Sequence, residues 1–313
     1  MSEWFRRSGT AGDGAYDLVI SPGDLPEWQC TGLRTATLAA GQSRTVATGA
    51  WEWIVLPLAG SFRVTARVGS EAGAGGAGAE AFAVDLAGRV DPFAGPTDSA
   101  YVGRDAEFTV TALTDGRIAL PHATARRAFP CAYVPADAVG VELRGAGQAS
   151  RQVQNFGTPD AVAADSIIAC EVITPAGNWS SYPPHKHDTD IEGVESALEE
   201  IYYYELRTEP AFAAAAGAGA GTPDPMGYQR VYGADERPMD LLAEVRSGDA
   251  VLIPHGWHGP SMAPTGYDMY YLNVMAGPGA TRVWLICDDP AHAWVRTTWD
   301  YQKVDPRLPL HQH

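Results

Sequence analysis

Four histidines stand in two short motifs that could hold a metal ion. His185 and His187 alternate in PPHKHD, and His255 and His258 lie in IPHGWHGP. On a β-strand, side chains at i and i+2 share a face, so His185 and His187 would point together, with Lys186 opposite. Two converging imidazoles suit zinc, iron, manganese or nickel. An isolated pair of this kind is also typical of a hydrogen-bonded surface loop, so other ligands must decide.

A carboxylate ligand has several candidates downstream, namely Asp190, Glu192, Glu195, Glu199 and Glu200. We predict Glu200, because it leads the aromatic run EEIYYYEL and would share a strand face with Tyr202 and Tyr204.

The order of these features resembles the metal ligands of the cupin superfamily, in which HxH, a glutamate and a later histidine come from neighbouring strands of a small barrel. The turn PHGWH resembles the cupin Pro-x-Gly followed by His, which favours His258 as the last ligand. One residue is missing from the common spacing, so His255 stays open as an alternative, or as a substrate contact or donor to a ligand. His122, His292, His311 and His313 have no partners in sequence and are interpreted as structural or exposed.

The elements that must position these residues are short β-type segments. Gly (34) and Pro (23) are frequent, and turn residues separate runs rich in Val, Ile, Tyr, Phe and Trp, such as DAVLIP and YDMYYLNVMAG. This pattern predicts an all-β fold of barrels or sandwiches. Only residues 192–199 and 239–245 have the spacing of short amphipathic helices.

A weak internal repeat predicts two tandem cupin (jelly-roll barrel) domains, an N-terminal degenerate domain over 1–148 and a C-terminal metal-binding domain over 149–313. The first copy lacks the histidines. Two Gly/Ala-rich patches, 69–81 and 211–225, are interpreted as slack hairpin loops, the second with room for one helical turn.

Five segments together resemble the 5-deoxy-glucuronate isomerase family of myo-inositol catabolism, a cupin family: SSYPPHKHD, EEIYYYEL, GYQRVYG, the run from GDAVLIPHGWHG to YLNVMAG, and WLICDDPAHAWVRTTW. The 5-keto-4-deoxyuronate isomerases are similar more distantly. The resemblance is densest from about 150 to 299 and implies that His185, His187, Glu200 and His258 hold the metal.

The resemblance also implies an aldose–ketose isomerase that converts 5-deoxy-D-glucuronate to 5-dehydro-2-deoxy-D-gluconate with one divalent ion (Zn, Mn, Fe or Ni) and no organic cofactor. Tyr202, Tyr271 and His255 are candidates for catalysing the proton transfer between C2 and C1. A hydride shift is the alternative mechanism. The candidate substrate contacts are Lys186 and Arg230 for the carboxylate, and Gln229. The alternative functions are a related uronate isomerase, a cupin dioxygenase and a non-catalytic sugar-binding cupin.

The charge balance excludes some partners. The formal net charge is −16 and no Lys/Arg cluster is present, so nucleic acid and anionic membranes are unfavourable partners, whereas a small sugar acid is compatible with a local cation. The four cysteines have no CxxC spacing, which favours reduced thiols. No apolar run reaches membrane-spanning length. We therefore expect a cytoplasmic enzyme, and the aromatic residues expected at its surface would suit a homo-oligomer.

Overall fold

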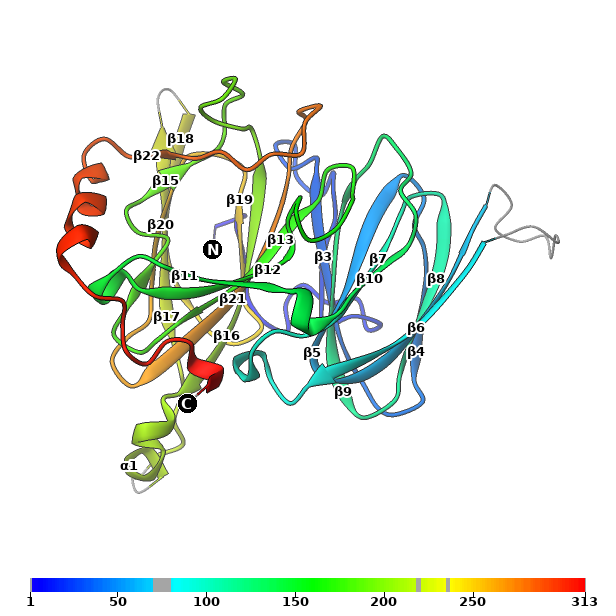
Figure 1. Ribbon diagram of the computed structural model, residues 1–313, viewed down its shortest axis with the longest axis horizontal. Helices are drawn as coiled ribbons and strands as arrows, with labels where there is room; N and C mark the ends of the chain where they lie inside the picture. The colour runs from blue at the N-terminus through cyan, green and yellow to red at the C-terminus, as the bar shows by residue number, and fades with distance from the viewer. Residues whose placement is uncertain (1, 70–79, 218–220, 235–236, 313) are drawn as a thin grey trace.

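The computed structural model describes residues 2–69, 80–217, 221–234 and 237–312. The described chain is built almost entirely of β-strands, which confirms the all-β prediction. Two halves lie side by side in Figure 1, the N-terminal half in blue and cyan and the C-terminal half in green to red. None of the helices in these ranges is long and apolar enough to cross a membrane.

The N-terminal half contains a nine-stranded sheet system, in which the long strand β5 pairs with β6, β7, β8 and β9. Its interior is an apolar cluster around Trp53, Phe62 and Phe108. The strands up to residue 134 are β1 (Phe5–Arg6), β2 (Leu18–Ile20), β3 (Thr31–Leu38), β4 (Ser43–Ala47), β5 (Trp51–Val68), β6 (Glu80–Arg89), β7 (Ser99–Val102), β8 (Ala106–Ala112), β9 (Gly116–Thr124) and β10 (Ala132–Val134).

The C-terminal half has two sheets, ordered β1-β19-β16-β21-β13-β12-β11 and β18-β17-β20-β15-β22, with β14 paired to β20. Its elements are β11 (Gly140–Arg144), β12 (Arg151–Gly157), β13 (Ile168–Thr174), β14 (Trp179–Ser180), β15 (His185–Lys186), β16 (Glu199–Thr208), α1 (Ala213–Gly217), β17 (Gly227–Ala234), β18 (Arg237–Val245), β19 (Ala250–Ile253), β20 (Trp257–Met262), β21 (Tyr267–Ala276) and β22 (Cys287–Asp288). A 3-10 helical segment, Ala293–Tyr301, follows.

Strand β16 shows how alternation builds this half. Tyr202 and Tyr204 enter the core between the two C-terminal sheets, whereas Ile201 and Tyr203 enter a core shared with the N-terminal half. A strand buried on both faces reads as a nearly continuous apolar and aromatic run. The shared core, together with the pairing of β1 with β19, joins the two halves.

Local predictions for three segments were wrong. Residues 192–199 form turns and the start of β16, and 239–245 belong to β18, whose side chains alternate between exposed and buried. Residues 211–225 are not a hairpin loop, because β16 and β17 belong to different sheets; the helical turn predicted there is α1. The patch 69–81 follows the hairpin prediction, since β5 pairs with β6, although residues 70–79 lie outside the described ranges.

Candidate metal centre

Three histidines converge between the two C-terminal sheets. His185 on β15 is paired directly with His258 on β20, and His187 follows β15. The candidate ligand atoms of the three side chains all lie within 4.8 Å of one another. The His258 ring centroid lies 4.4 Å from that of His185 and 4.7 Å from that of His187. All three are buried, so the group could hold a metal ion.

The turn before β20 requires glycine at position 256. Gly256 has φ +90°, and a Cβ there would lie 2.6 Å from the carbonyl oxygen of Tyr232. L-residues with side chains rarely adopt this backbone conformation, and the close carbonyl leaves no room for one. Gly256 therefore sets the direction from which His258 enters the barrel.

Glu200 is the carboxylate that the fold brings to the histidines. It stands at the beginning of β16, where it is paired with Ile253 and Met275, and only 1% of it is exposed. Its Oε2 lies 3.0 Å from Nε2 of His187 and 3.0 Å from Nε2 of His258. The sequence-based choice of Glu200 therefore agrees with this geometry, while its role as a ligand stays a prediction.

The other acidic candidates lie elsewhere. Glu199 points to the opposite face of β16, where it accepts hydrogen bonds from the backbone N–H groups of Gln29, Cys30 and Thr31. Glu195 accepts from Lys186 Nζ, and Asp190 and Glu192 are exposed. Alternation along the strand separates Glu199 from Glu200, because neighbouring side chains face opposite sides.

Backbone carbonyls orient two of the imidazoles. Nδ1 of His187 donates to the carbonyl of Leu198 at 3.1 Å, and Nδ1 of His258 donates to that of Gly256 at 3.2 Å. Each bond leaves Nε2 as the nitrogen that faces Glu200. This is the usual arrangement of metal-binding histidines, in which the second nitrogen is fixed by a hydrogen bond.

The electrostatics favour a positive charge between Glu200 and the imidazoles. Burial raises the pKa of Glu200, but its contacts with His187 and His258 outweigh burial and hold that pKa below its ordinary value. Burial lowers the pKa of His187, yet the neighbouring Glu200 carboxylate more than offsets this and raises it. Burial, together with His258 and His187, lowers the pKa of His185 well below its ordinary value.

The residues present fit a divalent cation. Nε2 of His258 is buried and has no hydrogen-bond partner among the described residues, although Oε2 of Glu200 is near. A buried imidazole nitrogen without a partner costs free energy, and a metal bond would satisfy it. Three imidazoles and one carboxylate match the preferences of zinc, manganese, iron or nickel.

Tyr202 and Tyr271, the two tyrosines predicted as candidates for proton transfer, lie in the barrel beside the three histidines. The ring of Tyr202 lies 4.8 Å from that of Tyr271 and 6.1 Å from that of His258. Their hydroxyls lie 2.8 Å and 3.3 Å from Oγ of Ser181. Burial raises the pKa of both tyrosines, so both are neutral O–H groups near pH 7.

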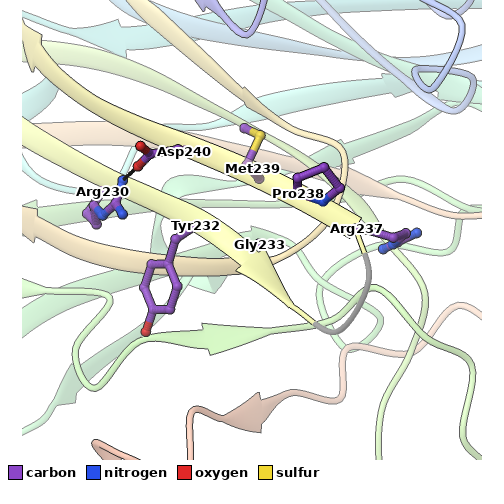
Figure 2. A pocket seen from close by; sticks show the side chains of 7 residues that line it. All are labelled: Arg230, Tyr232, Gly233, Arg237, Pro238, Met239 and Asp240. Carbon is purple, nitrogen blue, oxygen red and sulfur yellow. Dashed lines mark hydrogen bonds and ion pairs between the residues drawn. The ribbon is translucent and has the colours of Figure 1, made fainter.

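The remaining predicted residues lie away from the three histidines or have other partners. Gln229 is buried and accepts from Tyr204 Oη at 2.9 Å. His255 lies near Glu27, with Nε2 3.6 Å from Oε2. Arg230 forms an ion pair with Asp240 at a surface pocket that includes none of the three histidines, as Figure 2 shows.

Two acidic residues that support the site were not predicted to do so. Asp188 accepts hydrogen bonds from Gly256 N and Lys186 Nζ, both at 2.8 Å, and thereby ties the HxH segment to the turn before His258. Glu195 accepts from Lys186 Nζ and from the backbone N–H of Asp188. The signal in the sequence was the unusual density of acids after HKHD, of which one was expected as a ligand.

Comparison with known proteins shows the family of this chain. The model of the KduI/IolB family matches residues 4–295. This chain belongs to the KduI/IolB family. Among its relatives, the 5-deoxy-glucuronate isomerase of Geobacillus kaustophilus is 38% identical over 268 residues, 86% of each chain. That of Bacillus subtilis strain 168 is 42% identical over 200 residues, 64% of this chain and 67% of the relative.

Solved structures agree with this membership. The crystal structure of an IolB-like protein from Salmonella typhimurium LT2 has a TM-score of 0.78 and 34% identity, and covers 94% of this chain and 99% of that one. Lactobacillus farciminis oxalate decarboxylase has a TM-score of 0.58 at 12% identity, covering 92% and 89%, and shares the fold. The all-β cupin prediction is confirmed; the division at residues 148 and 149 stays a prediction.

Proposed function

We propose that this protein is a metal-dependent aldose–ketose isomerase that converts 5-deoxy-D-glucuronate to 5-dehydro-2-deoxy-D-gluconate in myo-inositol degradation. The observation that carries the proposal is the buried group of His185, His187, His258 and Glu200 in a chain of this family. A relative named 5-deoxy-glucuronate isomerase matches this chain over 86% of its own length. The reaction moves a hydrogen from C2 to C1 and involves no net oxidation.

The four residues would hold one divalent ion, zinc, manganese, iron or nickel. When bound, such an ion acts as a Lewis acid on the oxygens of an open-chain sugar. The protein's own contribution is orientation: the carbonyls of Leu198 and Gly256 fix two imidazoles, and Asp188 holds the turn before His258.

The tyrosines supply hydrogen-bond donors beside the metal centre. Tyr202 and Tyr271 share Ser181 Oγ, which holds their two hydroxyl groups close together beside the metal centre. Because their pKa values are raised, both donate as neutral phenols. We assign them to the sugar hydroxyls and to proton transfer, and we leave His255, which lies by Glu27, as the weaker candidate.

The wider setting is part of the same proposal. An isomerase needs no organic cofactor, since no electrons leave the substrate. We place the enzyme in the cytoplasm, in keeping with four cysteines that are far apart in the sequence and have no CxxC spacing. Exposed Trp294 and Tyr301 support a homo-oligomer, because large exposed aromatic side chains are enriched at interfaces.

The test is anaerobic turnover of 5-deoxy-D-glucuronate followed by proton NMR, with 5-keto-4-deoxyuronate as the competing substrate. The proposal expects conversion of the first without oxygen, at a higher kcat/KM than the second. In a parallel aerobic assay, turnover that requires and consumes oxygen would indicate a dioxygenase, and binding without turnover would indicate a sugar-binding protein. Preference for the second substrate would indicate the related uronate isomerase.

A further inference from the structure

Arg151 is a buried cation without a carboxylate partner among the described residues. It opens β12, and only 6% of it is exposed. Its hydrogen bond within the described ranges goes to the carbonyl of Ala149, at 3.1 Å from Nη1. A buried guanidinium carries five N–H donors and is costly unless an anion or acceptors satisfy it.

Two other cations of this half have carboxylate partners. Lys186 is bound to Asp188 and Glu195, with Nζ 2.8 Å from a carboxylate oxygen of each. Arg144, directly opposite Arg151 on β11, forms two hydrogen bonds to Glu142, at 2.9 and 2.7 Å. Arg151 differs from these two cations because it has no ion pair with a carboxylate in the described structure.

The surroundings of Arg151 add further hydrogen-bond donors. The guanidinium carbon of Arg151 lies 5.7 Å from the ring of Trp299, and that of Arg144 lies 5.5 Å from the ring of Trp284. Both indole Nε1 atoms are buried without a hydrogen-bond partner in the described structure. We call Arg151, Trp284 and Trp299 the donor cluster: the two indole N–H groups are unsatisfied, and the guanidinium of Arg151 donates to the carbonyl of Ala149.

The register places Arg151 on the inner face of the barrel. Val153, two residues along β12, belongs to the core between the C-terminal sheets and is paired with Val172 on β13, which is paired with Tyr271. Side chains at i and i+2 share a face, so Arg151 and Tyr271 face the same interior. Tyr271 and Tyr202 share Ser181, and Tyr202 contacts His258.

The charge state of Arg151 is consistent with anion binding. Burial lowers its pKa to about 10, and the nearby charges of Arg144 and Arg296 act in the same direction, whereas Tyr271 and Tyr202 oppose it. The side chain is therefore still a cation near neutral pH.

We propose that Arg151 binds the carboxylate of the sugar-acid substrate, with the indole N–H groups of Trp284 and Trp299 as further donors. The substrate would then extend from the metal centre, which takes its aldehyde end, past Tyr202 and Tyr271 to the donor cluster. Arg151 would thus set the preference for an acid over a neutral sugar. This inference rests on the proposed function.

The test compares 5-deoxy-D-glucuronate with 5-deoxy-D-glucose, in which a hydroxymethyl group replaces the carboxylate. For the unchanged protein we expect kcat/KM to favour the acid at least about 100-fold. Arg151→Met should abolish this preference mainly through KM, while the neutral sugar is converted about as fast as before. Arg151→Lys should keep part of the preference.

Arg246→Met is the matched control, because Arg246 lies at the surface and is paired with Asp224 and Glu244. It should leave the preference unchanged. Equal losses of kcat/KM on both sugars in Arg151→Met, or an unchanged preference, would overturn the inference.

A second readout separates this inference from the proposed function. Thermal unfolding of the metal-loaded protein is followed with and without 5-deoxy-D-glucuronate, which requires no turnover. Stabilisation that is lost in Arg151→Met and kept in Arg246→Met supports the carboxylate contact. Equal stabilisation of all three proteins, or none of any, refutes it. Failure of the unchanged protein to convert the acid refutes the function alone.

Discussion

Oε2 of Glu200 lies 3.0 Å from Nε2 of His187, and neither side chain is more than 2% exposed. The two residues are 13 positions apart in sequence, on opposite sides of the loop that contains Asp188 and Glu195. Asp188 and Glu195 in this loop bind Lys186. The chain therefore leaves the HxH motif, forms the loop, and comes back to His187 with the carboxylate of Glu200.

Replacing Glu200 by glutamine tests this contact. Glu200→Gln removes the negative charge with little change of shape, so metal affinity should fall by at least about 10- to 100-fold, and activity with it. Competition with a chelator measures the affinity.

Glu199→Gln is the control one residue away on the opposite face. It loses charge-assisted hydrogen bonds to the backbone of residues 29–31 and should lower the free energy of unfolding by about 1–3 kcal/mol, without changing metal affinity. If Glu200→Gln binds metal as tightly as Glu199→Gln, Glu200 is not a ligand.

Gly256 should be intolerant of any side chain. Gly256→Ala forces a strained φ and a contact with the Tyr232 carbonyl, so we expect a loss of at least about 1–2 kcal/mol in the free energy of unfolding and weaker metal binding. Gly266→Ala shares a positive φ, +92°, but meets no atom within 4 Å. Urea denaturation should show the smaller loss for Gly266→Ala; equal losses would mean that the contact has no role.

Lys186 is predicted by the structure to act through stability. Lys186→Met leaves Glu195 buried without its cation, while Asp188 keeps an ion pair with Arg237, and this should cost about 3 kcal/mol in the free energy of unfolding. Denaturant unfolding measures this, and KM for the acid substrate tests the sequence-based role. A raised KM with unchanged stability would restore Lys186 as a substrate contact.

His122 should make stability depend on pH. Burial lowers its pKa from 6.5 to about 3, and the charge of Arg34 acts in the same direction. Below pH 6.5 the unfolded chain therefore binds a proton that the folded chain excludes. Stability falls as pH falls from 6.5 toward 3, by up to about 1.4 kcal/mol per pH unit.

His122→Phe removes that titration and keeps an aromatic ring against Trp53, whose centroid lies 4.0 Å away. Urea unfolding between pH 4 and 7 should show a flatter pH dependence for this variant. Identical slopes for the two proteins would assign the pH dependence to other groups.

The features that could be predicted from the sequence are those that depend on strand alternation and on the chemistry of metal ligands. HxH on one strand face, Glu200 at the head of an aromatic strand, and the all-β architecture all follow from local pattern. The helix expected over 239–245 failed because LLAEV satisfies both helical spacing and strand alternation, and pairing with β17 decides between them.

Pairings between distant residues were beyond local pattern. Arg230 and Lys186 were predicted to bind the substrate carboxylate. In the fold, Arg230 is paired with Asp240, and Lys186 is paired with Asp188 and Glu195. No sequence pattern marks Arg151, since its lack of an ion-pair partner is visible only when β11, β12 and the segment around Trp299 come together.

The most direct test of the central claim is metal content measured against anaerobic isomerase activity in one preparation, as isolated, after chelation and after reloading. The account predicts one divalent ion per chain, loss of 5-deoxy-D-glucuronate conversion when the ion is removed, and recovery on reloading. It also predicts that His185→Ala neither retains the ion nor converts the substrate. Full activity in metal-free protein would contradict it.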